Sequence, residues 1–213
     1  MSSPSPLKIS QWAEPDSDSF AVRGANYVKD KQKIRAGASV FKLLTVDLIE
    51  VDAPIMTGIC SIPNERIQMA LKQENEGRDS GLPPFVFAVN IVVPGPPYYH
   101  LVMYFKVDEG QMDVLMGNVD TSFSKLAHKF FFEDDDNFRN HTFKLIPRIV
   151  EGNFIVRKAV GSTPAIMGTK LKQYYSRCPN NRYFELILDV TSSKIAAHVV
   201  SLAKGYAKNL IVD

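Results

Sequence analysis

The pattern of apolar and β-branched residues predicts six β-strands, at residues 40–50, 85–93, 98–107, 142–150, 153–160 and 183–190. The second and third flank Pro94-Gly95-Pro96-Pro97, which predicts a turn between antiparallel strands because proline cannot donate to a strand ladder. The fourth and fifth flank Glu151-Gly152, which predicts a second hairpin. The last stretch is apolar on parts of both faces, which indicates a central or covered strand.

Helical spacing of apolar residues predicts three helices, at about 63–73, 122–131 and 193–209. The third is the clearest, because Ser192 or Ser193 can accept hydrogen bonds from the unpaired backbone N–H groups at its start. Its apolar stripe of Ile195, Val199, Leu202 and Tyr206 is expected to pack on the sheet.

Two hairpins require antiparallel pairing, and the helices do not alternate with the strands as a parallel sheet requires. The predicted class is therefore α+β, an antiparallel sheet with one face covered by a long C-terminal helix. Residues 1–19 are rich in Ser, Pro and Asp and predict a flexible N-terminal tail, while residues 20–213 predict a single domain. Trp12 is either a stray aromatic residue or a plug that docks this tail on the domain.

Composition excludes several classes of protein. The chain has 213 residues, is 45% apolar and 23% charged, and carries a net charge of +2. These near-average fractions exclude a mostly disordered chain, and the small charge does not indicate nucleic acid as a partner. No apolar run approaches the roughly 18 residues of a membrane span, and the first residues lack the pattern of a secretory signal. Because Cys60 and Cys178 cannot form a disulfide framework, we expect a soluble, cytoplasmic protein.

Common catalytic motifs are missing from the sequence, which contains no G-x-S-x-G elbow, no Walker loop and no H-E-x-x-H. The four histidines, at positions 100, 128, 141 and 198, lack metal-ligand spacing with either cysteine. We therefore expect no catalytic residues, no bound metal and no cofactor.

Five basic residues gather in the region of the second predicted hairpin: Arg139, Lys144, Arg148, Arg157 and Lys158. In a hairpin centred near Glu151-Gly152, Lys144 and Arg157 fall nearly opposite each other, where like charges destabilise a bare sheet. Either solvent surrounds these charges, or an acidic side chain such as Asp79 or an anionic ligand neutralises them. Guanidinium groups bind phosphate or carboxylate bidentately, which favours an anionic ligand for a concave site.

Several separate motifs, in order, resemble one family. They are residues 20–27 (Phe-Ala-Val-Arg-Gly-Ala-Asn-Tyr), 78–84 (Arg-Asp-Ser-Gly-Leu-Pro-Pro), 138–140 (Phe-Arg-Asn), 143–147 (Phe-Lys-Leu-Ile-Pro), 152–168 and 189–213. From Trp12 to Asp213 the chain resembles the C-terminal domain of the plant Enhanced Disease Resistance Two family, a domain of unknown function. There the domain follows a pleckstrin-homology domain and a lipid-binding START domain, in proteins tied to phosphoinositide binding. The resemblance implies ligand contacts, or alternatively buried ion pairs, at the motif positions Arg23, Asp79, Arg139, Asn140, Lys144 and Arg157.

Taken together, these observations favour a non-catalytic lipid-binding or lipid-sensing domain, with a helix-grip (START-like) arrangement as the first expectation. An apolar cavity under the helix would hold the lipid, and Arg139, Lys144, Arg157 and Asp79 would contact an anionic head group. The expected partners are an anionic lipid or phosphoinositide and, transiently, a membrane surface. The alternative is a protein-interaction or regulatory module with a filled core, which would recognise partners through exposed loops. An unrecognised lipid hydrolase is the least favoured reading, and the sequence does not indicate an oligomeric state.

Overall fold

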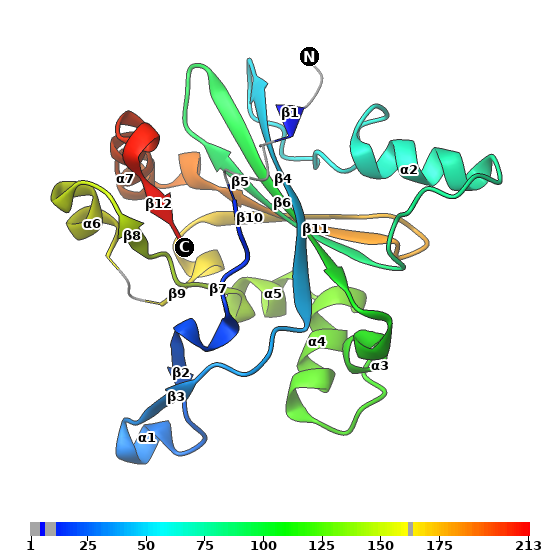
Figure 1. Ribbon diagram of the computed structural model, residues 1–213, viewed down its shortest axis with the longest axis horizontal. Helices are drawn as coiled ribbons and strands as arrows, with labels where there is room; N and C mark the ends of the chain where they lie inside the picture. The colour runs from blue at the N-terminus through cyan, green and yellow to red at the C-terminus, as the bar shows by residue number, and fades with distance from the viewer. Residues whose placement is uncertain (1–4, 7–11, 162–163) are drawn as a thin grey trace.

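The computed structural model describes residues 5–6, 12–161 and 164–213 of the chain. Its centre is a mixed sheet with the strand order β1-β4-β6-β5-β11-β10 (Figure 1). The strands are β1 (Ser5–Pro6), β4 (Phe41–Val51), β5 (Val86–Val93), β6 (Tyr98–Val107), β10 (Lys172–Arg177) and β11 (Tyr183–Asp189). All neighbours run antiparallel except β5 and β11, which are parallel.

The first predicted hairpin is confirmed. Strands β5 and β6 pair antiparallel up to Val93 and Tyr99, and the proline-rich turn joins them. The expected strands at 40–50 and 183–190 correspond to β4 and β11, and all seven residues of β11 are buried, as expected for a covered strand. Strand β10 was not expected, because its sequence Lys-Gln-Tyr-Tyr-Ser-Arg is mostly polar, as suits the edge of a sheet.

The second predicted hairpin is wrong. The region instead holds α5 (Asp136–Thr142), β7 (Lys144–Leu145), β8 (Ile149–Glu151) and α6 (Phe154–Val160). Strand β7 pairs with β9 (Ala165–Ile166), and β8 pairs with β12 (Ile211–Val212). The Asn153 side chain accepts a hydrogen bond from the Ile155 N–H, so the chain after Gly152 begins a capped helix rather than a returning strand.

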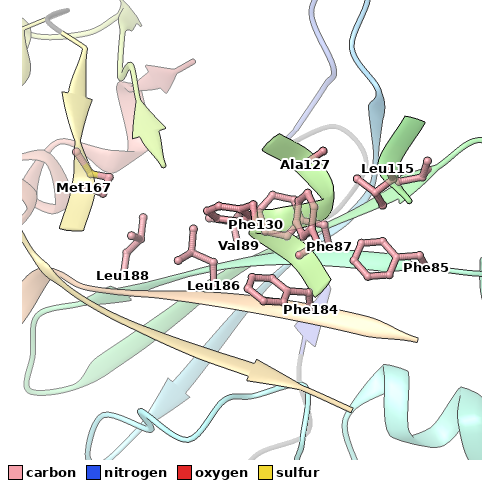
Figure 2. Close-up of a cluster of buried hydrophobic side chains, with 12 residues drawn as sticks. Phe85, Phe87, Val89, Leu115, Ala127, Phe130, Met167, Phe184, Leu186 and Leu188 are labelled. Carbon is pink, nitrogen blue, oxygen red and sulfur yellow. The ribbon is translucent and has the colours of Figure 1, made fainter. Parts of the chain in front are cut away.

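One face of the sheet is covered by α3 (Met112–Leu115), α4 (Ser122–Phe132) and α5, and its core is rich in phenylalanine (Figure 2). The Phe131 ring of α4 lies 5.1 Å from Phe87 and 5.4 Å from Phe184, between centroids, in edge-on contacts. Phe130 lies 5.7 Å from Phe184. Aromatic rings in such tilted and edge-on pairs fill the space between helix and sheet.

The other face is covered by α2 (Arg66–Asn75) and by the loop of residues 52–65 that leads into it. Ile59, Cys60 and Ile67 pack there against Val86 and Val102. Because successive strand residues point to opposite faces, β5 contributes Val86 to this face and Phe87 to the phenylalanine face.

The C-terminal helix α7 (Lys194–Gly205) begins at Ser193, whose hydroxyl accepts from the Ala196 N–H at 3.3 Å. The structure thus confirms the α+β class, with a mostly antiparallel sheet and a C-terminal helix. None of the side chains of α7 is buried, however, and Ile195 and Tyr206 of the expected stripe are exposed. The prediction that the whole stripe packs on the sheet is therefore wrong at these two positions, and α4 supplies the apolar helix face in its place.

The remaining elements are small. A hairpin of β2 (Ala21–Arg23) and β3 (Lys33–Arg35) encloses α1 (Tyr27–Asp30). Single 3-10 turns are η2 (Ser17–Ser19), η3 (Glu109–Gln111), η4 (Met167–Thr169), η5 (Val190–Ser192) and η6 (Ala207–Asn209). Within the described ranges, none of the helices combines the length and apolar character that crossing a membrane requires.

The expected flexible tail, residues 1–19, lies partly outside the described residues, which omit 1–4 and 7–11. In the part that is described, Trp12 is half-buried and its ring nitrogen is enclosed. Glu14 accepts a hydrogen bond from the Leu43 N–H of β4 at 3.2 Å. Both observations favour docking of Trp12 and its neighbours on the domain.

Candidate functional site

The structure places Arg139, the first expected site residue, in α5 with only 2% of its surface exposed. Its Nε donates to the Phe130 carbonyl at 2.7 Å, and its other nitrogens donate to the Asp136 carboxylate and to the Glu133 carbonyl. The two carbonyls lie at the C-terminal end of α4, where backbone oxygens have no partner within the helix. Arg139 therefore ties α5 to the end of α4, and each of its three guanidinium nitrogens donates a hydrogen bond to the protein.

Lys144 and Arg157, expected to oppose each other in a hairpin, lie on different kinds of element. Lys144 is exposed on β7, whose partner is β9. Arg157 is exposed on α6, where its Nη2 donates to the Val150 carbonyl at 3.2 Å. The like-charge pair that the hairpin would have created is absent, because the hairpin does not form.

Asp79 is exposed in the loop after α2, where its carboxylate accepts from the Gly81 N–H at 2.9 Å. Helix α2 lies far from α6 in the molecule (Figure 1). The structure thus brings Arg139 and Lys144 into the same region, on either side of the short link from α5 to β7. Asp79 lies apart from Arg157.

A different surface gathers exposed apolar and basic side chains. We call it the α6/α7 end, and it consists of β8, α6, α7 and β12, which contact one another at one side of the molecule (Figure 1). Its most exposed apolar side chains are Ile195 (81%), Phe154 (75%) and Ile155 (58%). Val150, Ile211 and Val212 of the two short strands are also exposed. Monomeric soluble proteins rarely expose many large apolar side chains together unless they bind something there.

Local sequence explains why these side chains project. Gly152 has a φ of +144°, and a Cβ at this position would overlap the Leu210 side chain, so the link between β8 and α6 needs glycine. The cap at Asn153 then begins α6 directly, which places Phe154 and Ile155 in its first turn. Ser193 starts α7 in the same way, so Ile195 also lies in a first turn. Arg148 and Asp213 exchange two backbone hydrogen bonds, of 2.7 and 2.8 Å, that close the β8/β12 pair.

Charge at the α6/α7 end is strongly positive. Residues 148–160 and 193–213 contain six Lys or Arg and two acidic residues, a net charge of +4 against +2 for the whole chain. Arg148 is paired with Asp213. The other five, which are Arg157, Lys158, Lys194, Lys204 and Lys208, form no ion pair with any residue of the described ranges. This surface therefore presents uncompensated positive charge beside exposed apolar groups.

A second feature with chemical potential is a chain of buried polar groups on the α2 face of the sheet. The Ile55 N–H donates to His100 Nε2 at 3.1 Å, so the ring hydrogen lies on Nδ1 and is donated to Asn90 Oδ1 at 2.9 Å. The Asn90 amide in turn donates to Glu185 Oε1 at 2.8 Å. Burial lowers the pKa of His100 to about 4, which keeps the imidazole neutral.

Glu185 ends this chain of hydrogen bonds. Its carboxylate accepts from the Ile59 and Cys60 N–H groups at 2.9 and 3.0 Å. Burial, followed by the nearby Glu185, raises the pKa of the Cys60 thiol well above its usual range. His100, Asn90, Cys60 and Glu185 have no exposed surface, and their hydrogen bonds hold the loop of residues 52–65 on the sheet.

Two further carboxylates continue this buried layer. Glu65 caps α2 by accepting from the Ile67 N–H at 2.7 Å, and it also accepts from the Tyr104 hydroxyl at 2.7 Å. Burial raises the pKa of Glu65 to about 7. Asp47 is held bidentately by Arg66, with N–O distances of 2.7 and 2.9 Å. No group of three or more His, Cys, Asp or Glu side chains suited to a metal ion occurs among the described residues, and both cysteines are free and buried.

Sequence reasoning missed Phe154, Ile155 and Ile195 as surface groups. The signal was available at Asn153, a strong helix cap that precedes two apolar residues, but the apolar and β-branched residues at 153–160, after the expected turn at Glu151-Gly152, favoured a strand. The sequence also did not single out Glu185, which the structure buries with hydrogen-bonding partners from the distant loop of residues 52–65.

These observations define the class of protein as a mixed α+β domain with a packed core and an exposed basic and apolar end. The chain belongs to the family described as Protein ENHANCED DISEASE RESISTANCE 2, C-terminal, whose model matches residues 12–213. The resemblance seen in the sequence motifs is thereby confirmed. A relative from Arabidopsis thaliana, named Protein ENHANCED DISEASE RESISTANCE 2-like, is 34% identical over 202 residues. That match covers 95% of this chain and 25% of the relative, so the chain spans about a quarter of the relative's length. No solved structure matches the chain.

Proposed function

We propose that this domain binds anionic membrane surfaces through the α6/α7 end, as a non-catalytic lipid-binding module. The observation that carries the proposal is the exposure of Phe154, Ile155 and Ile195 at the α6/α7 end, where five cations have no ion-pair partner in the described ranges. Apolar side chains at a membrane surface enter the boundary between head groups and acyl chains, and nearby Lys or Arg residues add attraction to anionic lipids.

The distribution of charge over the chain also supports membrane binding through the α6/α7 end. Outside residues 148–160 and 193–213, the rest of the chain has a net charge of −2. An anionic surface would therefore attract the α6/α7 end and repel the remainder of the molecule, which orients the domain as it approaches.

Packing of the sheet favours a surface site over an internal lipid cavity. Phenylalanine rings fill the face under α4, and α2 with its loop covers the other face. The lipid would therefore contact the outer surface of α6 and α7. Of the basic residues expected to contact an anionic head group, Arg157 keeps that role in this proposal, and Lys158 and Lys194 join it.

Vesicle co-sedimentation tests this proposal. We expect binding to vesicles of phosphatidylcholine with 30% phosphatidylserine, little binding to phosphatidylcholine alone, and loss of binding as salt is raised. Replacing Arg157 and Lys158 by Ala should weaken binding roughly thirtyfold, since each cation near an anionic surface contributes about 1 kcal/mol.

A matched control separates the apolar contribution. Phe154→Ser should weaken vesicle binding, whereas Phe123→Ser, at an exposed phenylalanine of α4 outside the α6/α7 end, should not. Equal effects of the two substitutions, or binding that does not depend on phosphatidylserine, would contradict the proposal.

The loop of residues 78–84 favours a second candidate, the protein-interaction module. Arg182 contacts the Glu74 carboxylate and donates to the Pro83 and Pro84 carbonyls, and Ser80 donates to Glu74 at 2.7 Å. These bonds hold the loop in one conformation while Asp79 stays exposed, as suits a loop that recognises a partner. An Asp79→Ala variant that loses a cellular protein partner but keeps vesicle binding would support this candidate beside the first.

A further inference from the structure

An open, polar pocket of about 410 Å³ lies between the end of α5, the segment from η4 into β10, and η5. Its lining includes Asn140, Gly168, Lys170, Lys172, Gln173 and Ser192. All nine of its lining residues belong to the described part of the chain; two are lysines and none is acidic.

The walls of the pocket are held in place by packing and hydrogen bonds. A Cβ on Gly168 would overlap the Asn140 backbone, so glycine lets η4 lie directly against the end of α5. The Tyr175 hydroxyl lies 2.9 Å from Asn140 Oδ1 and 2.8 Å from Gln173 Oε1. Ser192 accepts from the Lys172 N–H at 2.8 Å and donates to the Asp189 carbonyl, which fixes β10 to η5. The pocket is therefore preformed.

Several donors at this pocket have no acceptor among the described residues. Lys170 and Lys172 are exposed and form no ion pair with a described residue. Gln173 Nε2 is buried and has no hydrogen-bond partner within the part of the chain that the structure describes. A buried donor without an acceptor is unfavourable, and an oxygen from a ligand would relieve it.

We infer that this pocket binds a phosphate monoester group. A phosphate monoester carries about −1.5 to −2 charges at pH 7 and three strong acceptor oxygens. Two lysines match that charge, and the unpaired Gln173 amide supplies a directional donor. A carboxylate carries a single negative charge, so it would balance the charge of only one of the two lysines.

Position links the pocket to the α6/α7 end. Ser192 precedes Ile195 by three residues, so their Cα atoms lie at most about 11 Å apart. For a phosphate carried on a lipid, the inference rests on the proposed membrane function. A soluble phosphate ester offers the same chemistry without it.

Two probes test the pocket and separate these sources. The first is inorganic phosphate, which should raise the Tm of the full chain by about 2–4 °C over chloride at equal ionic strength. The second probe is a pair of vesicle preparations matched in surface charge. One contains phosphatidylcholine and phosphatidic acid, whose head group is a phosphate monoester. The other contains phosphatidylcholine and phosphatidylserine. We expect tighter binding to the phosphatidic acid vesicles.

The Lys170→Ala/Lys172→Ala variant should lose both responses, while Lys29→Ala/Lys72→Ala, a control of equal charge elsewhere on the surface, should keep them. Gln173→Leu should keep or raise the Tm without phosphate and lose the phosphate response. If Gln173→Leu instead lowers the Tm and keeps the response, the residue is structural and the inference is overturned.

The outcomes distinguish this inference from the proposed function. A phosphate response without vesicle binding supports the pocket with a soluble ligand and removes the membrane function. Binding to phosphatidylserine vesicles, with no phosphate response and no preference for phosphatidic acid, keeps the membrane function and overturns the pocket.

Discussion

The two faces of the sheet are stabilised by different means. On the phenylalanine face, Phe87 and Phe184 from the strands meet Phe130 and Phe131 from α4, and shape alone determines the packing. On the α2 face, buried His100, Asn90 and Glu185 are joined by hydrogen bonds to an irregular loop. An apolar face tolerates exchange of similar side chains, whereas a buried polar chain depends on every donor and acceptor. The difference predicts how each face responds to substitution.

The largest effect is expected on the phenylalanine face. Phe131→Ala removes a buried ring that contacts Phe41, Phe85, Phe87 and Phe184, and should lower the free energy of unfolding by about 3–5 kcal/mol. Urea denaturation measures this loss, and Phe131→Leu should recover much of it. Equal losses for Ala and Leu would show that the aromatic shape, not only apolar volume, is required there.

A smaller but sharper effect is expected on the α2 face. Glu185→Leu leaves the Ile59 and Cys60 N–H groups and the Asn90 amide without their acceptor, and should lower the free energy of unfolding by about 3 kcal/mol. Glu185→Gln retains one acceptor oxygen and should lower it less. A Glu185→Leu variant as stable as the wild type would show that the carboxylate is dispensable. That result would contradict the dependence of the α2 face on its buried hydrogen bonds.

On the α2 face, Glu65 and His100 should change the pH dependence of stability in opposite directions. The pKa of Glu65 is raised to about 7, so its protonation favours the folded state as pH falls from 7 towards 4.5. The pKa of His100 is lowered to about 4, so the folded state loses stability as pH falls from 6.5 towards 4. The two contributions nearly cancel in the wild type.

Glu65→Gln removes one of them and tests the cancellation. Between pH 6.5 and pH 5, its free energy of unfolding should fall by about 2 kcal/mol relative to that of the wild type, because the contribution of His100 is no longer offset by that of Glu65. Denaturation at a series of pH values measures both curves. Parallel curves for the two proteins would show that Glu65 does not titrate in this range.

The smallest effect is expected away from both faces. Ile195→Ser, at an 81% exposed position of α7, should change the free energy of unfolding by less than about 0.5 kcal/mol. A loss of several kcal/mol would mean that α7 packs its first turn more closely than the structure shows.

Periodicity predicted the parts of the fold that follow an apolar pattern. Strands β4, β5, β6 and β11 and the helices α2, α4 and α7 all correspond to expected elements. It failed at residues 142–160, because short strands that pair with distant segments, such as β8 with β12, leave no local signal. The parallel pairing of β5 and β11 is likewise set by the long connection between them.

Candidate site residues were harder to predict than the fold. Arg139 stood in a recognisable motif, yet the sequence does not reveal that it is buried between α4 and α5. Lys144 and Arg157 were correctly read as basic groups, but their predicted opposition depended on a register that the cap at Asn153 prevents. Exposure is a property of the assembled structure, which is why Phe154 and Ile195 were not recognised as surface groups.

The buried polar chain also has a consequence for the loop of residues 52–62. Most of this loop has no regular secondary structure, yet the amides of Ile55, Ile59 and Cys60 donate to side chains anchored in the sheet. Opening these bonds would leave the buried side chains of His100 in β6 and Glu185 in β11 without their partners, which is costly. Hydrogen exchange at the three amides will therefore be as slow as in the sheet core, and will report global unfolding rather than fluctuation of a loop.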